Sequence, residues 1–207
     1  MNQYIVKINE KEINLKIIYE DNHIIVVEKP VNIPSQGDKT GDIDMQNDFI
    51  DGSLGTAQAV SIVPNVVAKI NAWDGDIIAT RDTHFNNYLE TCEGRHLPVP
   101  HCIVDTNGHN INEEVLSALT KRGCFMTLNK LTFGSTALPE IIRGLNYDYI
   151  ELVGLCTDIC VVSNAMLLKA NYPETDIAVD ASCCAGVTPE SHNAAITTMK
   201  MCQIEII

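Results

Sequence analysis

The fold of this chain can be read outward from one stretch, Ile150-Glu151-Leu152-Val153-Gly154-Leu155-Cys156-Thr157-Asp158-Ile159-Cys160. Its first part is a short apolar run, which is typical of a strand that is buried on both faces of a sheet. We predict that this strand ends at Gly154. Thr157 or Asp158 is suited to cap a helix that follows from Ile159 to about Ala170.

Cys160 falls in the first turn of this predicted helix, just beyond the C-terminal end of the strand. Backbone N–H groups and the helix dipole favour a thiolate at such a position, so we expect a thiol pKa below the free value of about 8.5. A thiolate is a nucleophile, which makes Cys160 a candidate catalytic residue. The alternative is a buried structural thiol, the usual role of a cysteine among apolar residues.

Strands and helices alternate along the rest of the chain from about Asp42 onward. We predict helices at residues 56–73, 112–122, 136–145, 159–170 and 189–201, and strands at 76–80, 124–128, 150–154, 176–181 and 203–207. This alternation predicts an α/β fold with a three-layer, doubly wound and mostly parallel sheet. Ligands of such a sheet bind at the C-terminal ends of its strands.

The first 41 residues differ in character, so we predict two parts, residues 1–41 and 42–207. The runs Leu15–Tyr19 and His23–Val27 predict a β-hairpin, and residues 29–41 have the proline and glycine content of a linker.

Residues 17–30, Ile-Ile-Tyr-Glu-Asp-Asn-His-Ile-Ile-Val-Val-Glu-Lys-Pro, resemble the start of the catalytic domain of RNA pseudouridine synthases. That activity depends on an aspartate in an Arg-Leu-Asp motif, and this chain contains no such motif. We therefore expect a fragment of that domain without its activity.

Charge and composition exclude several classes of protein. A formal net charge of −13 argues against nucleic acid as a partner, because a phosphate-binding surface needs a basic excess. No apolar run approaches the roughly 20 residues of a membrane span, and the first residues do not resemble a signal peptide. The eight cysteines lie in apolar, strand-like runs rather than in metal-binding pairs. We expect reduced thiols and a cytoplasmic protein without a membrane partner.

Polar side chains follow several of the predicted strands. Asp44, the run Arg81-Asp82-Thr83-His84, Lys130 and Cys160 all occupy such positions, so they are expected to meet at one edge of the sheet. A thiol becomes reactive when a base takes its proton and a cation holds the charge. Asp44 is suited to be that base and Lys130 that cation. The alternatives are a loop carboxylate and a solvated loop lysine.

These residues belong to motifs that resemble the isochorismatase-like cysteine hydrolases, whose best-known members are nicotinamidases. The motifs are Asp44-Met45-Gln46-Asn47-Asp48-Phe49, Arg81-Asp82-Thr83-His84, Lys130 with Phe133-Gly134-Ser135, and Val153–Cys160. The resemblance covers about residues 42–207. It implies a triad of Asp44, Lys130 and Cys160, a cysteine thioester, and release of ammonia from an amide. It also implies a cis peptide before Cys156, with the N–H groups of Cys156 and Cys160 as oxyanion hole.

The resemblance also raises the question of a metal, since nicotinamidases hold a divalent ion beside the triad. Asp82 and His84 point the right way as first ligands. Of the nearby residues we expect Glu93 and His101 to complete the site, with His96 in reserve and Cys92 a weaker candidate. Such a mixed N/O site suits zinc first, or iron or manganese. The alternatives are that Asp82 and His84 only bond nearby backbone, and that the protein is one of the family's metal-free members.

Aromatic side chains near these motifs are suited to hold a flat ring. Phe49 is the first choice, followed by Phe133 and Tyr88. We therefore expect an amidohydrolase acting on a small-molecule amide, with nicotinamide as the expected substrate. Assembly as a homo-oligomer is expected from family analogy alone. The alternatives are a metal-free relative acting on another amide and a non-catalytic fusion protein with a relic triad.

One segment departs from the family pattern. Residues 35–43, Ser-Gln-Gly-Asp-Lys-Thr-Gly-Asp-Ile, precede Asp44 where the family has an apolar strand, and they are too polar to be buried on both faces of a sheet. We expect the N-terminal hairpin and linker to replace that first strand, or residues 24–27 to fill its place. Asp44 would then hang from a loop, and activity would be impaired or lost.

Overall fold

The computed structural model of the chain describes residues 3–8, 11–20, 25–28, 39–123, 125–145 and 147–207. The chain divides into two compact units, Met1–Ser35 and Gln36–Ile207. This division falls earlier than the predicted boundary at residue 41. Among the described helices, none combines the length and hydropathy that a membrane span requires.

The first unit contains an antiparallel sheet in the order β1-β2-β3. Its strands are β1 (Gln3–Ile8), β2 (Lys11–Glu20) and β3 (Ile25–Glu28). The antiparallel pairing of β2 with β3 confirms the two strands of the predicted hairpin. Its turn and the linker at residues 29–38 lie outside the described residues.

The second unit is built on a six-stranded sheet in the order β6-β5-β4-β7-β8-β9, in which neighbouring strands run parallel. The strands are β4 (Lys39–Asp44), β5 (Asp76–Asp82), β6 (Met126–Lys130), β7 (Tyr149–Leu155), β8 (Asp176–Ala185) and β9 (Glu205–Ile206). The chain adds strands to one side of β4 and then, from β7, to the other side. The crevice at this reversal is where doubly wound sheets bind ligands.

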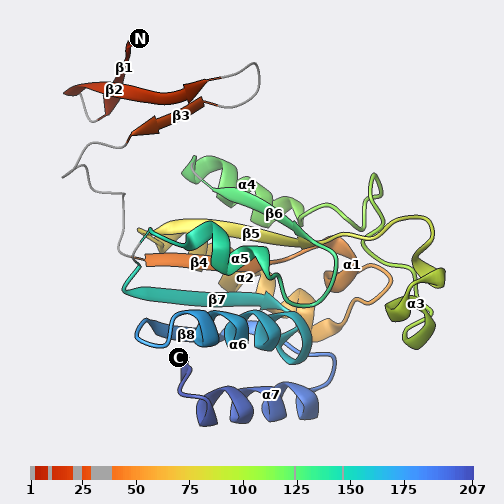
Figure 1. Cartoon of the computed structure of the whole chain (residues 1–207). Coiled ribbons are helices and arrows are strands. Elements are labelled where there is room, and N and C mark those ends of the chain that lie inside the picture. Colours follow the sequence, from red (N-terminus) through yellow and green to blue (C-terminus); the bar gives the residue numbers. More distant parts are fainter. Residues whose placement is uncertain (1–2, 9–10, 21–24, 29–38, 124, 146) are drawn as a thin grey trace. The chain divides into compact units, whose positions relative to one another are not determined.

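Helices cover both faces of this sheet (Figure 1). They are α1 (Asn47–Ile50), α2 (Ala57–Ala72), α3 (Cys92–His96), α4 (Glu113–Arg122), α5 (Ala137–Ile142), α6 (Val162–Asn171) and α7 (Pro189–Met201), with single turns η1 (Tyr88–Glu90) and η2 (Thr157–Val161). Helices α2, α4 and α7 begin at side-chain caps that the sequence supplies, such as Thr56, whose hydroxyl accepts from Ala59 N at 3.0 Å. The predicted three-layer α/β fold is confirmed.

Two hydrophobic cores lie on opposite faces of the sheet. On β7, Val153 and Leu155 pack toward α2 and α4, whereas Ile150 and Leu152 pack toward α5, α6 and α7. Successive residues of a strand point to opposite faces, so only an apolar run can serve both cores. This is why residues 150–155 are apolar on both faces apart from Glu151, whose buried carboxylate pairs with Lys69.

The expectation that the first central strand is missing is wrong. β4 lies between β5 and β7 and pairs with both, from Thr40 opposite Asp76 to Asp44 opposite Gly154. Residues 39–41 are therefore strand rather than linker, and β3 belongs to the other sheet instead of filling a vacant place. A middle strand is hydrogen-bonded along both edges, and this position outweighs its weak intrinsic propensity. Asp44 ends a central strand and does not hang from a loop.

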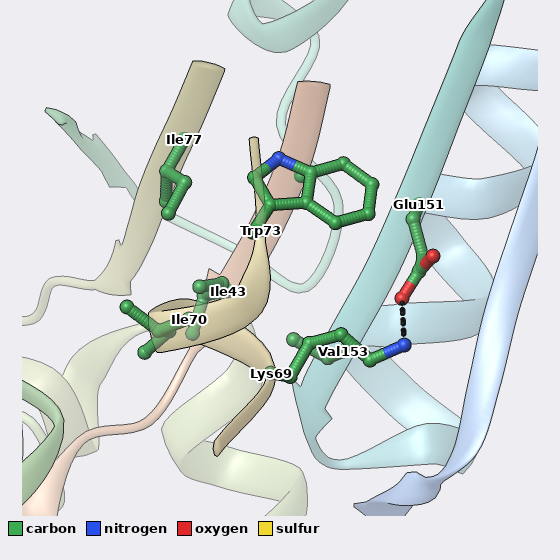
Figure 2. A pocket seen from close by; sticks show the side chains of 8 residues that line it. Ile43, Lys69, Ile70, Trp73, Ile77, Glu151 and Val153 are labelled. Carbon is green, nitrogen blue, oxygen red and sulfur yellow. Dashed lines mark ion pairs between the residues drawn. The ribbon is translucent and has the colours of Figure 1, made fainter. Parts of the chain in front are cut away.

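A small cavity lies beside Gly41 and Ile43 of β4 (Figure 2). It measures about 20 Å³, and its lining combines Gly41, apolar side chains and the ion pair of Lys69 Nζ with Glu151 Oε1, 2.9 Å apart. Lys69 also lies 2.7 Å from Asp180 Oδ2. A Cβ atom at Gly41 would lie 3.6 Å from the Glu151 carbonyl oxygen and 3.8 Å from Cε2 of Trp73, which are ordinary contacts. Gly41 thus leaves space that a methyl group would occupy.

Candidate active site

Three buried side chains from three different strands meet at the C-terminal edge of the sheet. Lys130 ends β6, Asp44 ends β4, and Cys160 lies in the η2 turn after β7; each is about 3% exposed. The Lys130 Nζ lies 3.1 Å from Asp44 Oδ2 and donates to Cys160 Sγ at 3.4 Å. The acid, the amine and the thiol, separated by up to 116 positions along the chain (160 − 44), thus form one contact chain.

The charge state of Lys130 is set by its charged neighbours rather than by its burial. Burial alone lowers the pKa of Lys130, but the neighbouring Asp44, Cys160 and Asp82 outweigh it and raise that pKa well above its ordinary value. Lys130 is therefore an ammonium throughout the physiological range. The Asp44 carboxylate therefore lies beside a full positive charge.

The prediction that the Cys160 thiol has a lowered pKa is wrong for the protein without bound ligands. Burial raises its pKa well above the ordinary value; Lys130 opposes this shift, and Asp44 adds to it. The expectation considered only the helix terminus and the cation, but a fully enclosed thiolate also loses its hydration. Without a bound ligand Cys160 is therefore a thiol, and it could act as a nucleophile only if a base took its proton.

The backbone around Cys160 has two unusual features. The peptide bond between Leu155 and Cys156 is cis, as predicted from the resemblance. The next five residues, Thr157–Val161, form a π-type turn in which the Cys156 carbonyl accepts from Ile159 N and Val161 N, both at 3.1 Å. Cys160 lies within this turn rather than in the first turn of α6, which begins at Val162.

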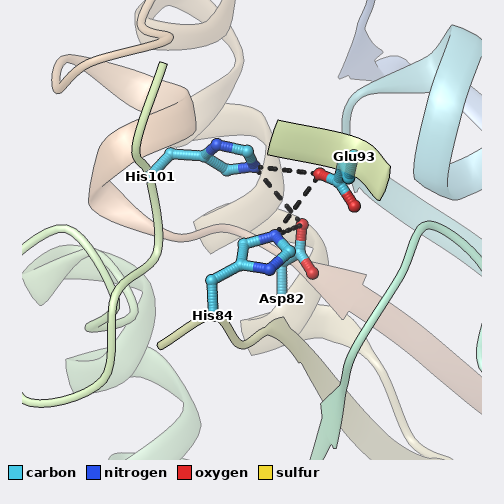
Figure 3. Close-up of side chains that lie close together, drawn as sticks. All are labelled: Asp82, His84, Glu93 and His101. Carbon is cyan, nitrogen blue, oxygen red and sulfur yellow. Dashed lines mark ion pairs between the residues drawn. The ribbon is translucent and has the colours of Figure 1, made fainter. Parts of the chain in front are cut away.

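Four potential metal ligands gather beside this group (Figure 3). Asp82 ends β5, His84 follows it, Glu93 lies on α3, and His101 comes from the loop after α3. The Nε2 atom of His84 lies 3.4 Å from both Asp82 Oδ2 and Glu93 Oε1. The Nε2 atom of His101 lies 3.7 Å and 3.5 Å from the same two oxygens. These are the four residues that the sequence analysis names as the expected metal ligands.

The donor set and its spacing fit a small divalent cation. Zinc binds nitrogen and oxygen at about 2.0–2.2 Å, which puts tetrahedral ligands about 3.3–3.6 Å apart, close to the observed separations. His101 Nδ1 donates to the Val99 carbonyl oxygen at 2.9 Å, so it is Nε2 that faces the cluster and would give its lone pair to a metal. The buried atoms His84 Nε2 and Glu93 Oε1 have no hydrogen-bond partner among the described residues. A bound cation would satisfy both.

The electrostatics of the cluster point the same way. Burial lowers the pKa of His84, but the carboxylates of Asp82 and Glu93 outweigh it and raise the pKa to about 9. Burial raises the pKa of Asp82, and contacts with His101 and His84, together with the Lys130 charge, bring it below its ordinary range. Two carboxylates therefore hold a proton on His84 when no metal is present. A divalent cation would take over the role of that proton.

A cavity of about 280 Å³ connects the two groups. Cys156 and Cys160 lie on its wall together with Asp82, Glu93 and His101, and the rest of the lining is apolar: Phe49, Leu54, Leu97, Phe133, Ile159 and Val187. Two of the three predicted aromatic residues, Phe49 and Phe133, thus line it.

The third predicted aromatic residue, Tyr88, is not part of this lining. It is 1% exposed and packs edge-on against the rings of two potential metal ligands, His84 and His101, with 4.7 and 5.1 Å between ring centroids. The reserve ligand His96 also lies apart from the cluster, with Nδ1 2.8 Å from the Cys92 carbonyl oxygen on α3.

Two further residues organise the site, and their roles were not anticipated. The Gln46 side chain is fully buried and bonds to both backbone groups of Asp82: its Oε1 accepts from Asp82 N at 2.6 Å, and its Nε2 donates to Asp82 O at 2.9 Å. Asp48 accepts from Cys102 N at 2.7 Å. Both residues lie in a motif quoted above, but a motif does not say which distant backbone its side chains bond.

The fold and this site define an α/β protein with a buried carboxylate–ammonium–thiol group beside a potential metal centre. The model of the isochorismatase domain matches residues 43–207. The chain belongs to the isochorismatase family of hydrolases.

Individual relatives agree with this assignment. The chain is 24% identical over 179 residues to the nicotinamidase/pyrazinamidase of Mycobacterium tuberculosis, covering 80% of this chain and 95% of that protein. The crystal structure of a pyrazinamidase/nicotinamidase from Streptococcus mutans matches with a TM-score of 0.72 and 26% identity, over 82% of this chain and 99% of the other. The pyrazinamidase of Pyrococcus horikoshii in complex with zinc has a TM-score of 0.66 at 23% identity, over 82% and 98%.

Proposed function

We propose that this protein is an amidohydrolase that converts nicotinamide to nicotinate and ammonia through a thioester on Cys160. One observation carries the proposal: the Lys130 ammonium touches both the Asp44 carboxylate and the Cys160 sulfur, and the thiol opens onto an apolar cavity. Relatives named as nicotinamidases or pyrazinamidases support the choice of an aromatic carboxamide.

In the first half of the reaction the sulfur of Cys160 attacks the amide carbon while Asp44 takes the thiol proton. Lys130 holds Asp44 ionised and in position for this transfer. The negative charge on the amide oxygen is stabilised by the backbone N–H groups of Cys156 and Cys160, the proposed oxyanion hole. The C–N bond then breaks, and Asp44 passes its proton to the leaving nitrogen, which departs as ammonia.

In the second half, water attacks the thioester carbon while Asp44 accepts one of its protons. The C–S bond breaks, the carboxylic acid forms, and the proton returns to the sulfur of Cys160. Substrate amide and water are thereby converted to acid and ammonia, with the thiol and the carboxylate restored. A raised thiol pKa fits this scheme, because the proton leaves only when attack begins.

The cavity is suited to a single flat ring. Phe49 and Phe133 both line it, and its apolar lining would exclude water from the reacting carbon. Its volume of about 280 Å³ is near the lower end for small-molecule sites. Larger amides are expected to be poor substrates.

Asp82, His84, Glu93 and His101 would hold the metal, for which we propose zinc, with iron or manganese as alternatives. When bound, the cation supplies a Lewis-acid contact for a ring nitrogen and for water. The zinc complex of the Pyrococcus horikoshii relative supports this choice. A metal-free relative would not need four ligands gathered at these separations.

Impaired activity was expected because Asp44 was predicted to hang from a loop. Asp44 instead ends a paired central strand, so that reason no longer applies. The decisive experiment measures ammonia and nicotinate released from nicotinamide by zinc-loaded protein, with Cys160→Ala as control. We expect turnover by the natural chain and a loss of about 10³-fold or more in the variant. Equal rates for both proteins would refute the mechanism. Absence of turnover in the natural chain, with zinc bound, would favour another amide or a relic site.

A further inference from the structure

Asp48 lies outside both the triad and the four metal ligands, yet it contacts the segment that carries one of them. It belongs to the short helix α1, just after Asp44 in sequence. Its Oδ2 accepts from the backbone N–H of Cys102 at 2.7 Å, and its Oδ1 accepts from Ser53 N at 3.2 Å. Cys102 directly follows the metal ligand His101.

The backbone at Cys102 needs such support. Its φ of 46° lies in the left-handed region, which is unfavourable for a residue other than glycine. Its side chain is fully buried, so the turn is enclosed by the protein. The carboxylate of Asp48 holds the N–H of this strained residue. It thereby sets the direction in which the preceding side chain, that of His101, leaves the backbone.

The rest of the loop is fastened to the same helix. Asp48 N donates to Gly108 O at 3.2 Å, and Asn47 N donates to Asn110 O at 2.9 Å. Gly108 approaches so closely that a Cβ atom there would lie 1.9 Å from Asp48 Oδ2. The loop therefore wraps around the Asp48 carboxylate, and only a residue without a side chain permits this at position 108.

We propose that Asp48 is a positioning residue for the metal centre: it preorganises His101 and thereby sets the affinity for a divalent cation. This inference rests on the metal site of the proposed function, but it does not depend on the amide substrate. In Figure 3, His101 is the ligand that comes from this loop, whereas Asp82 and His84 come from the end of β5 and the segment after it. Asp82 is positioned by β5 and Glu93 by α3, whereas the position of His101 depends on the loop that Asp48 fastens.

Zinc affinity of the metal-free protein, measured by competition with a chromophoric chelator, tests the proposal in Asp48→Asn. In the carboxamide an NH2 group, which cannot accept, replaces one of the two oxygens that now accept from Cys102 N and Ser53 N, and the remaining oxygen loses the negative charge that strengthens its hydrogen bond. We expect the Kd for zinc to rise about 10- to 100-fold, the usual cost of disturbing a group that orients a ligand. The matched control is Asp51→Asn, an exposed carboxylate at the end of the same helix, with Kd unchanged within about twofold.

Two measurements keep the outcome decisive. If Asp48 were only structural, Asp48→Asn would lower the Tm of the metal-free protein and leave the zinc Kd unchanged, which would overturn the proposal. Gly108→Ala is the second variant, because its methyl group would displace the same carboxylate; it should weaken zinc binding in the same direction. If the natural chain itself bound no zinc, the metal site of the proposed function would fail. If the natural chain and both variants bound zinc equally, only the role of Asp48 would fail.

Discussion

Lys130 and Asp82 join the two halves of the site: Lys130 Nζ lies 3.8 Å from Asp82 Oδ1, while Oδ2 of the same carboxylate faces His84 and His101. One carboxylate thus contacts the ammonium of the proposed triad and two of the other potential metal ligands. Gln46 holds it from behind through both backbone groups of Asp82. We therefore expect the proposed metal centre and the proposed nucleophile to be coupled through a single side chain.

Asp82→Asn should damage both halves, because it removes a metal ligand charge and a negative charge beside Lys130. We expect zinc affinity to fall and kcat/KM to fall by about 10²-fold or more, even with zinc in excess. Glu93→Gln is the comparison, since Glu93 is a potential metal ligand and no contact with Lys130 is seen among the described residues. Excess zinc should restore much of its activity. Full rescue of Asp82→Asn by zinc would contradict the coupling.

Lys130→Met should unfold the protein more easily as well as abolish turnover. The Lys130 side chain is 1% exposed, and its removal leaves the buried carboxylates of Asp44 and Asp82 without their ammonium. Breaking a buried pair from one side costs about 3–5 kcal/mol in the free energy of unfolding. Urea denaturation measures it, with Lys121→Met, an exposed lysine on α4, as the control near zero. A loss below about 1 kcal/mol would show that the pair is solvated.

The raised pKa of the Cys160 thiol predicts slow alkylation at neutral pH. A raised pKa means less thiolate at any given pH, so the rate with iodoacetamide should be low at pH 7 and keep rising into the alkaline range. Cys92 and Cys202 are exposed free thiols of the same chain and serve as internal controls in peptide mass spectrometry. A Cys160 rate that reached its plateau near neutral pH would instead indicate a stabilised thiolate.

Gly41→Ala should stabilise the protein. The added methyl group meets only ordinary contacts beside the small cavity under β4, and it reduces the conformational freedom of the unfolded chain. We expect a gain of about 0.4–1 kcal/mol in the free energy of unfolding, seen as a higher Tm.

Gly154→Ala is the opposite case on the neighbouring strand. Gly154 has a φ of 116°, and a Cβ atom there would lie 2.4 Å from the Asp44 carbonyl oxygen. The variant should lose stability and displace Asp44. If the two alanines changed the Tm alike, the backbone assigned to β4 and β7 would be wrong.

Much of this architecture could be predicted from the amino-acid sequence. The strand at residues 150–154, the helical spacing between residues 56 and 73, and the order of the motifs predicted the parallel sheet, and they singled out the three residues of the proposed triad and the four potential metal ligands that the structure brings together. The positions of Asp44, Asp82 and Lys130 follow from a local rule, since a polar residue at the C-terminal end of a buried strand must lie at the edge of the sheet.

Residues 39–44 show where such rules fail. Thr40 and Gly41 lack the composition of a buried strand, yet β4 lies at the centre of the sheet because both its neighbours hydrogen-bond to it. The raised pKa of Cys160 is a second instance, since it depends on enclosure by segments from the whole chain.

The amino-acid sequence by itself determined which chemical groups are present and at which strand ends they lie, because strand and helix periodicity is local. Only the tertiary structure decided that Lys130 touches both Asp44 and Cys160, that Asp82 serves two groups at once, and that Asp48 holds the turn after His101. Those relationships depend on distances between segments that are far apart in sequence. Such distances are set by how the strands pair and how the loops pack, which no single segment encodes.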